Sequence, residues 1–234
     1  MATRTHLDAL TVRRLRRGVG TIAIILPIAV TIGNSVIQGK FTLLGSVSGA
    51  YHSGMRDWFV GSLCAMGVFL ICYRYAKLDD WLSTIAGTAA ILVALFPTKA
   101  RGEASTADLW IWWIHLAASV IMFATLAVFC FFVFTRTYRG IPKQEAPGPK
   151  RKRNAIYIVC GWAIIGGLGL GAGLSAILPH DIEVAVQPLF WGESIAIWAF
   201  GTAWLAKGDA IIRDNAGEDV LPEVGTETPA VGIG

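Results

Sequence analysis

The sequence predicts an all-α, polytopic integral membrane protein: a helical bundle of about six transmembrane helices, N-inside and C-inside. Three observations predict this fold class. Of 234 residues, 54% are hydrophobic and 15% charged, with a mean hydropathy of +0.57, and soluble domains rarely have such values. The apolar residues form runs long enough to cross about 30 Å of hydrocarbon. Lysine and arginine concentrate in alternate connecting segments.

Six apolar runs are the candidate spans. They cover residues 19–38, 57–75, 82–98, 109–135, 156–178 and 187–206. The first run follows a cluster of arginines, as the core of a signal peptide does. Its length and the later runs indicate a signal-anchor that is retained.

The orientation follows from the basic residues of the short loops. With the N-terminus inside, the inner segments hold 16 Lys and Arg residues and the outer segments hold 4. This split predicts that both termini are cytoplasmic. The basic run 150–153 is explained by the same rule, with contact to anionic lipid head groups as an addition. Membrane lipid is therefore the expected partner, nucleic acid is not expected, and no protein partner is indicated.

The chain divides around one membrane domain. Residues 1–18 are a basic cytoplasmic segment, and 19–206 form the membrane domain. A cytoplasmic linker at 138–154 is rich in proline and glycine and ends in the basic run. Residues 207–234 are polar, acidic and then glycine-rich, which predicts a disordered cytoplasmic tail.

The fifth span is unusually rich in glycine. Two pairs are spaced four residues apart, Gly167 with Gly171 and Gly169 with Gly173. This spacing lines one side of a helix with glycine and lets a neighbouring backbone approach closely. Helix packing is the favoured interpretation, and pore lining is the alternative.

Polar residues inside or next to the spans need a reason, because they are costly in hydrocarbon. They lie in the segment entering the second span, in the fourth span and in the sixth span: Ser48, His52, Arg56, Asp57, His115 and Glu193. With the N-terminus inside, all of them fall on the outer side. The sequence therefore predicts an outward-facing polar pocket among the second, fourth and sixth spans.

The spacing in the first of these segments depends on its local structure. If residues 48–57 form one helix, Ser48, His52 and Arg56 share a face and Asp57 points elsewhere. A break at Gly54 would instead let Asp57 turn inward. The sequence leaves both open.

Three chemical interpretations of the polar residues remain open. His52 and His115, with Asp57 or Glu193, form a ligand set of the kind that holds a catalytic metal with one open position. Alternatively, Arg56 pairs with one of the carboxylates, and the histidines are hydrogen-bonded between helices. The third interpretation is proton or ion movement through the same side chains.

Three segments carry a resemblance to known proteins: 46–70 (SVSGAYHSGMRDWFVGSLCAMGVFL), 113–135 (WIHLAASVIMFATLAVFCFFVFT) and 188–208 (PLFWGESIAIWAFGTAWLAKG). They resemble an uncharacterised family of bacterial membrane proteins with about six spans. This resemblance implies a multi-pass protein of the bacterial cytoplasmic (inner) membrane.

The early motif is also distantly similar to the hydrolase-like superfamily of alkaline ceramidases and progestin/adipoQ receptors. That superfamily holds zinc with three histidines, beside a serine and an aspartate. By position, Ser48, His52 and Asp57 match its early motif, and His115 is a candidate third partner. The chain departs from it in having six predicted helices instead of seven, and in carrying Glu193 where the last helix has paired histidines.

Two functional hypotheses follow. The first is a metal-dependent hydrolase of a lipid-like amide or ester, with zinc as the implied cofactor. Its metal ligands would be His52, His115 and Asp57, and its other catalytic groups Ser48, Arg56, Asp57 and Glu193. Ser48 and Arg56 would orient the substrate or the developing oxyanion. The second is a non-enzymatic small transporter, lipid sensor or accessory subunit with a structural polar network.

Overall fold

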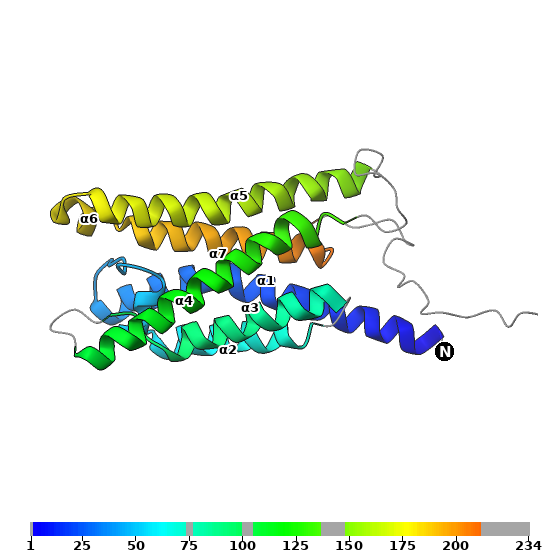
Figure 1. The fold of residues 1–234 in the computed structure, drawn as a ribbon, viewed down its shortest axis with the longest axis horizontal. Helices are drawn as coiled ribbons and strands as arrows, with labels where there is room; N and C mark the ends of the chain where they lie inside the picture. The colour runs from blue at the N-terminus through cyan, green and yellow to red at the C-terminus, as the bar shows by residue number, and fades with distance from the viewer. Residues whose placement is uncertain (1, 74–76, 100–104, 137–147, 212–234) are drawn as a thin grey trace, which may run out of the picture.

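The computed structural model describes residues 2–73, 77–99, 105–136 and 148–211, and within these ranges it contains helices and no strand (Figure 1). The elements in chain order are α1 (Ala2–Gln38), the 3-10 helix η1 (Ser48–His52), α2 (Arg56–Ile71), α3 (Lys77–Leu95), α4 (Thr106–Val128), the π turn η2 (Phe129–Val133), α5 (Gly148–Ile177), α6 (His180–Val186) and α7 (Pro188–Lys207). The all-α fold class is confirmed.

Each of the six apolar runs lies on a helix. Four helical stretches are long and apolar enough to cross a membrane: 10–38 on α1, 78–95 on α3, 106–133 on α4 with η2, and 148–177 on α5. The other two runs correspond to α2 and α7, which have 16 and 20 residues. The chain therefore has the helices of a membrane-embedded protein, and the count of six spans stays a prediction.

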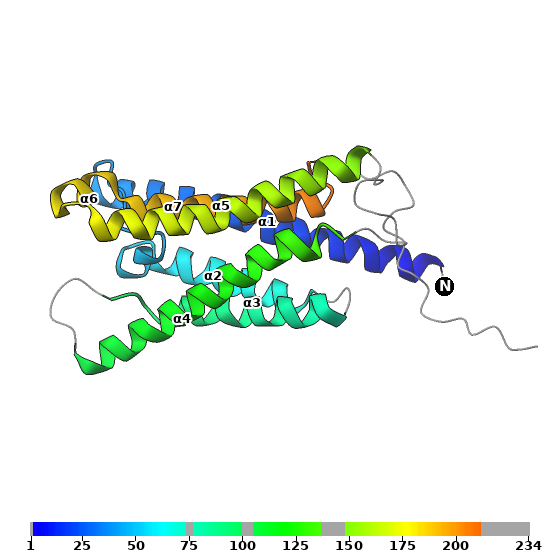
Figure 2. The same cartoon turned by 45° about the horizontal axis from the view of Figure 1, so that its top comes forward.

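The six long helices close a ring. α5 packs against α7, α7 against α1, α1 against α2, α2 against α3 and α3 against α4. α4 crosses obliquely and meets α5 to complete the circuit (Figure 2). The start of α1 lies at one end of the bundle, and η1 and α6 lie at the other (Figure 1).

The outside of this ring is apolar along its length. Large side chains such as Val36, Val159, Leu170 and Ile177 are exposed, and so are Trp58, Trp110, Trp113 and Trp191 near the end that carries η1 and α6. A monomeric soluble protein rarely exposes apolar surface of this extent. The same surface suits contact with lipid chains, with tryptophans at the head-group boundary.

Local sequence signals explain two helix boundaries at the η1 end. The hydroxyl of Ser105 accepts a hydrogen bond from the Asp108 backbone N–H at 3.2 Å, and the Asp108 carboxylate accepts one from the Ser105 N–H at 2.9 Å. This reciprocal capping box starts α4. Between α6 and α7, Gln187 adopts a left-handed conformation with φ of 52°, and Pro188 then begins α7 at a position where its missing N–H is not needed.

Glycines bring α5 and α7 into backbone contact. A Cβ added to Gly192 would lie 2.5 Å from the Gly167 carbonyl oxygen and 2.9 Å from the Gly171 Cα, so only glycine fits there. The packing interpretation of Gly167 and Gly171 is therefore confirmed. By contrast, nothing lies within 4 Å of a Cβ added to Gly169 or Gly173, so these two do not serve this contact.

Buried charges join three helices at the end that carries the start of α1. The Asp209 carboxylate pairs with Arg153 of α5 at 3.0 Å and with Arg13 of α1 at 3.2 Å, and Arg153 is only 3% exposed. Arg16 of α1 donates to the Lys207 carbonyl at 3.2 Å. Residues 207–209 thus belong to the bundle, which differs from the predicted tail of 207–234.

The predicted linker of 138–154 also differs in part from the structure. Its last residues, 148–154, form the first turns of α5, where the Lys150 ammonium is buried and donates to the Phe134 carbonyl at 3.0 Å. Residues 137–147 and 212–234 lie outside the described residues.

Replacing Gly192 by alanine should destabilise the bundle. The added methyl group would overlap the α5 backbone, and overpacking of this kind costs about 1–3 kcal/mol. Gly169→Ala is the matched control, because its Cβ meets open space on the same helix pair. We expect thermal unfolding in detergent to show a lower Tm for Gly192→Ala and an unchanged or higher Tm for Gly169→Ala. Equal Tm values for the two variants would contradict the close packing.

Candidate functional site

A half-buried carboxyl group, that of Glu193, lies where η1 meets α7. The Glu193 Oε2 atom accepts a hydrogen bond from the Ser48 backbone N–H at 3.0 Å, and Oε1 accepts one from the Ser48 hydroxyl, also at 3.0 Å. The two residues are 145 positions apart in the chain. Both carboxyl oxygens are therefore held by one residue of the segment that follows α1.

A second serine fixes the geometry of η1. The Ser46 hydroxyl lies 3.2 Å from that of Ser48 and accepts a hydrogen bond from the Gly49 N–H at 2.8 Å. Both serines are buried. This local turn presents the N–H and the hydroxyl of Ser48 toward Glu193 of α7.

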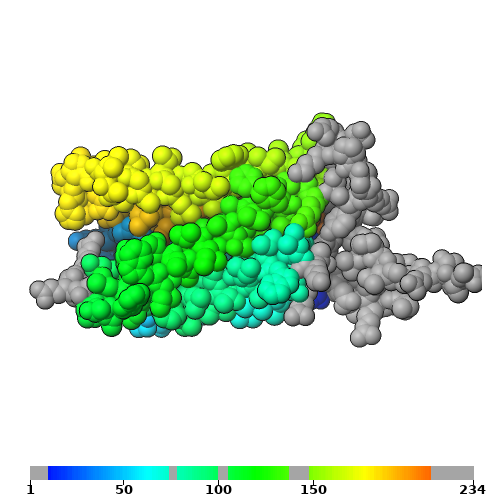
Figure 3. All heavy atoms as spheres, in the orientation of Figure 1, coloured from blue at the N-terminus to red at the C-terminus, as the bar shows by residue number. Residues whose placement is uncertain are grey.

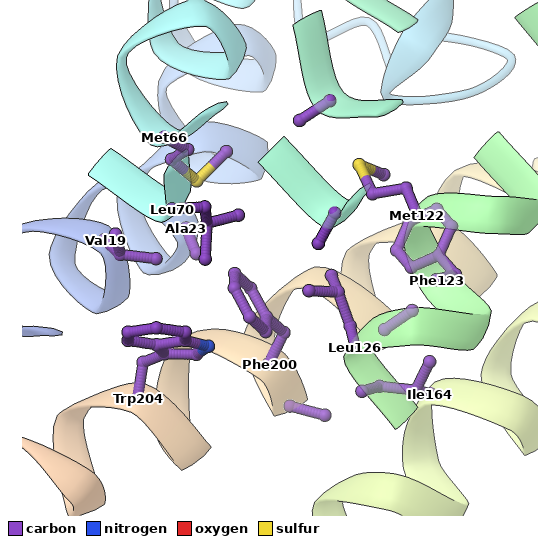
Figure 4. Close-up of a cluster of buried hydrophobic side chains, with 14 of the residues drawn as sticks. Val19, Ala23, Met66, Leu70, Met122, Phe123, Leu126, Ile164, Phe200 and Trp204 are labelled. Atoms are coloured by element: carbon purple, nitrogen blue, oxygen red, sulfur yellow. The ribbon is translucent and has the colours of Figure 1, made fainter. Parts of the chain in front are cut away.

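Glu193 and Ser48 lie at the wall of a pocket in the middle of the helix ring. The pocket has a volume of about 40 Å³, and Ser119 of α4 supplies a further hydroxyl. Its remaining wall is apolar and comes from five helices: Leu26, Phe59, Leu63, Met66, Leu70, Ala90, Val93, Met122, Phe123, Leu126, Ile197 and Phe200, with Val47 before η1. Figure 4 shows Met66 and Leu70 of α2, Leu126 of α4 and Phe200 of α7 gathered around this space.

The charge of Glu193 has no basic partner in the described residues. Arg56, the partner that the sequence suggested, instead donates to the Tyr51 hydroxyl at 2.7 Å, and its guanidinium carbon lies 4.3 Å from the centre of the Tyr51 ring. An ionised carboxylate among apolar side chains costs several kcal/mol unless a cation neutralises it. Glu193 is thus suited to binding a proton or a small cation from the pocket.

The two histidines hold the end of α3. His115 is 5% exposed, and its Nδ1 atom donates to the Phe96 carbonyl at 2.7 Å. His52 is exposed, and its Nε2 atom donates to the Thr98 carbonyl at 2.7 Å. The carbonyls at a helix C-terminus lack intrahelical partners. Both imidazoles therefore act, in this arrangement, as ties to the segment after α3.

Residues 48–57 do not form one helix. η1 ends at His52, and Ser53 is extended, with φ of −122° and ψ of 175°, before α2 begins at Arg56. Ser48 is consequently buried toward Glu193, while His52 and Arg56 are exposed. The shared face expected for a continuous helix is not formed.

Asp57 lies in the first turn of α2 and is exposed. No hydrogen bond or ion pair to it occurs within the described ranges. A carboxylate at this position is favourable to the helix N-terminus through its dipole. The break after η1 does not turn Asp57 into the pocket.

The predicted metal ligands do not form a shared site. Within the described ranges, no group of three or more His, Cys, Asp or Glu side chains is placed to hold one metal ion. His52 and His115 use one ring nitrogen each for a backbone carbonyl, and Glu193 is occupied by Ser48. The zinc set of His52, His115 and Asp57 is therefore not assembled among the described residues.

Sequence reasoning missed the polar groups at the other end of the bundle. Arg16 donates to the Tyr73 hydroxyl at 3.0 Å as well as to Lys207, and Arg136 pairs with the buried Asp79 at 3.2 Å. In the sequence these residues follow the basic pattern of cytoplasmic loops. The one available signal was the pair of acidic residues, Asp79 and Asp209, next to the ends of apolar runs.

The chain matches no protein-family model, no curated protein and no solved structure. The resemblances drawn from the three sequence segments therefore stay predictions.

Removing the His115 side chain should weaken the fold more than removing His52. His115→Ala removes a buried imidazole and leaves the partly buried Phe96 carbonyl without its donor, at a cost of about 1–3 kcal/mol. His52→Ala is the matched control, since it removes the same kind of bond where water can replace it. Denaturant or thermal unfolding in detergent would measure both. A larger loss for His52→Ala would contradict the structural role of His115.

Proposed function

We propose that this chain is a non-enzymatic, proton-linked membrane carrier in which Glu193 is the proton-binding group. It would cross the bacterial cytoplasmic membrane six times, with both termini inside and the Glu193 pocket facing outward. The observation that carries the proposal is a pocket-lining carboxyl group held by Ser48 and left without a basic partner in the described residues.

The chemistry of the pocket favours a proton as the bound species. A carboxyl group in apolar surroundings gains a proton readily when no cation is present, because the neutral form avoids the desolvation cost. The Ser48 N–H and hydroxyl stabilise the ionised form through charge-assisted hydrogen bonds. The site can thus support both protonation states, as a group that must take up and release a proton requires.

The size of the pocket supports a small ligand. A cavity of about 150 Å³ accepts benzene, and a water molecule needs about 10–15 Å³. At about 40 Å³, this pocket has room for a few waters beside Glu193. A lipid-like amide or ester would not fit without separation of the helices, so the hydrolase hypothesis gains no support from the pocket.

The two ends of the pocket differ in a way that suits alternating access. Toward the η1 and α6 end, α4 and α5 diverge, and part of α7 is visible between them (Figure 3). Toward the other end, Phe200 packs on Trp204 at 5.8 Å between ring centres, and Trp204 packs on Phe134 at 5.4 Å. Beyond these rings lie the ion pairs of Asp209. Release to the inside would require this aromatic and ionic layer to open.

Proton entry into liposomes tests the proposal. Purified protein is reconstituted around a pH-sensitive dye, a potassium diffusion potential is imposed, and internal acidification is recorded. We expect the wild type to acidify faster than empty liposomes, and Glu193→Gln to fall to the empty-liposome rate because the amide cannot carry the proton.

Asp57→Asn is the matched control for this experiment. It removes an acidic residue from the same end of the bundle, but one that is exposed and outside the pocket wall. It should retain the wild-type rate. A wild-type rate in Glu193→Gln, or an equal loss in both variants, would refute Glu193 as the proton-binding group.

A further inference from the structure

A surface groove separates α1 from the end of α7, at the end of the bundle opposite η1. Its volume is about 510 Å³, and its wall is formed by Arg17 and Thr21 of α1 together with Leu205, Asp209, Ala210 and Ile211. The groove is distinct from the Glu193 pocket, with which it shares no lining residue.

Arg17 is a fixed cation at this groove. Its Nε atom donates to the Gly208 carbonyl at 2.8 Å, and Nη2 donates to the Asp209 carbonyl at 3.2 Å. Both acceptors are neutral. The Asp209 carboxylate is already occupied by Arg153 and Arg13. Arg17 is therefore oriented by the end of α7, yet no carboxylate in the described ranges neutralises it.

The neighbouring charges strengthen the positive potential of the groove. Arg14 is exposed one turn before Arg17 on α1, and it has no hydrogen-bond or ion-pair partner among the described residues. Among the described residues, Asp209 is the one acidic residue of the groove wall. An anion that enters here meets at least one preorganised guanidinium with donor capacity left, the group best matched to phosphate oxygens.

The same face of α1 continues as an apolar strip. Thr21, Ile25, Ile28 and Ile32 follow Arg17 at spacings of three and four residues and are all exposed. The fifteen residue steps from Arg17 to Ile32 span about 22 Å along a helix at 1.5 Å per residue. One leaflet of a bilayer, head groups included, is about 20–22 Å thick.

We propose that an anionic glycerophospholipid binds in this groove. Its phosphate would accept hydrogen bonds from Arg17, with the Thr21 hydroxyl as a second donor, and an acyl chain would lie along Ile25 and Ile28. The combination of a fixed cation, a hydroxyl one turn deeper and an apolar strip of one-leaflet length fits a lipid better than a free phosphate. The proposal does not depend on the role of Glu193.

Lipid binding can be measured on the full chain purified in detergent. The Tm and the number of lipids retained in native mass spectrometry are compared for phosphatidylglycerol and for phosphatidylcholine with the same acyl chains. We expect phosphatidylglycerol to raise the Tm more and to be retained at one molecule per chain. An equal Tm rise with inorganic phosphate alone would overturn the assignment to a lipid, as would equal effects of the two lipids.

Variants locate the site. Arg17→Gln should weaken phosphatidylglycerol binding about tenfold or more, since it removes a charge-assisted bond. Arg17→Gln also removes two hydrogen bonds to the end of α7. For each variant, therefore, the quantity compared is the difference in binding between phosphatidylglycerol and phosphatidylcholine. Thr21→Val, which keeps the side-chain volume, should weaken binding less, in the same direction.

Arg151→Gln is the matched control, because it removes one exposed positive charge at the same end of the bundle but outside the groove wall. It should leave phosphatidylglycerol binding within about twofold of the wild type, given that surface charges are screened within about 10 Å. Wild-type binding in Arg17→Gln, or an equal loss in Arg151→Gln, would overturn the site and indicate diffuse attraction instead.

Discussion

The close approach of α7 to α5 and α1 determines where the Glu193 side chain lies in the bundle. Gly192 touches the α5 backbone on one side, and Gly201, further along α7, lies against Gly20 of α1, where an added Cβ would be 2.9 Å from the Gly20 carbonyl oxygen. Small residues on two faces fix both the depth and the rotation of the helix. The remaining face carries Glu193, Ile197 and Phe200 and points into the central pocket. Glu193 reaches Ser48 because its helix cannot turn away.

The buried and half-buried acidic groups at the two ends of the bundle have different kinds of partner. At the end of α7, Asp209 is satisfied by two arginines, so the charges cancel and the helix ends are tied together. Near the start of α7, Glu193 receives two hydrogen bonds from Ser48 and no basic partner among the described residues. The first arrangement is what a structural contact requires. The second leaves Glu193 free to change its charge state. For this reason we propose a functional role for Glu193 and a structural role for Asp209.

The sequence predicted the helices well because their signal is local. Each apolar run is a helix, and the glycine spacing of the fifth run predicted the contact through Gly167 and Gly171. It also predicted that Glu193 and Ser48 belong to one polar site. It left open whether His52 and His115 bind a metal or are hydrogen-bonded between helices, because any sequence provides the backbone carbonyls that they bind. It also left open whether the segment before α2 breaks near Gly54, because such a break depends on packing. The sequence did not predict the ion pairs of Asp209. A charged residue next to an apolar run is interpreted as part of a loop, and the sequence does not show whether it is solvated or buried.

Infrared difference spectroscopy can show directly whether the Glu193 carboxyl group binds and releases a proton inside the pocket. Acid-minus-alkaline spectra are recorded for the purified wild type, Glu193→Gln and Ser48→Ala. We expect a carbonyl band of a protonated carboxylic acid in the wild type that is missing from Glu193→Gln. In Ser48→Ala this band should move to higher frequency, because the hydroxyl no longer donates to the carboxyl oxygen. Identical spectra for the wild type and Glu193→Gln would show that Glu193 does not change its protonation state, and would rule it out as the proton-binding group.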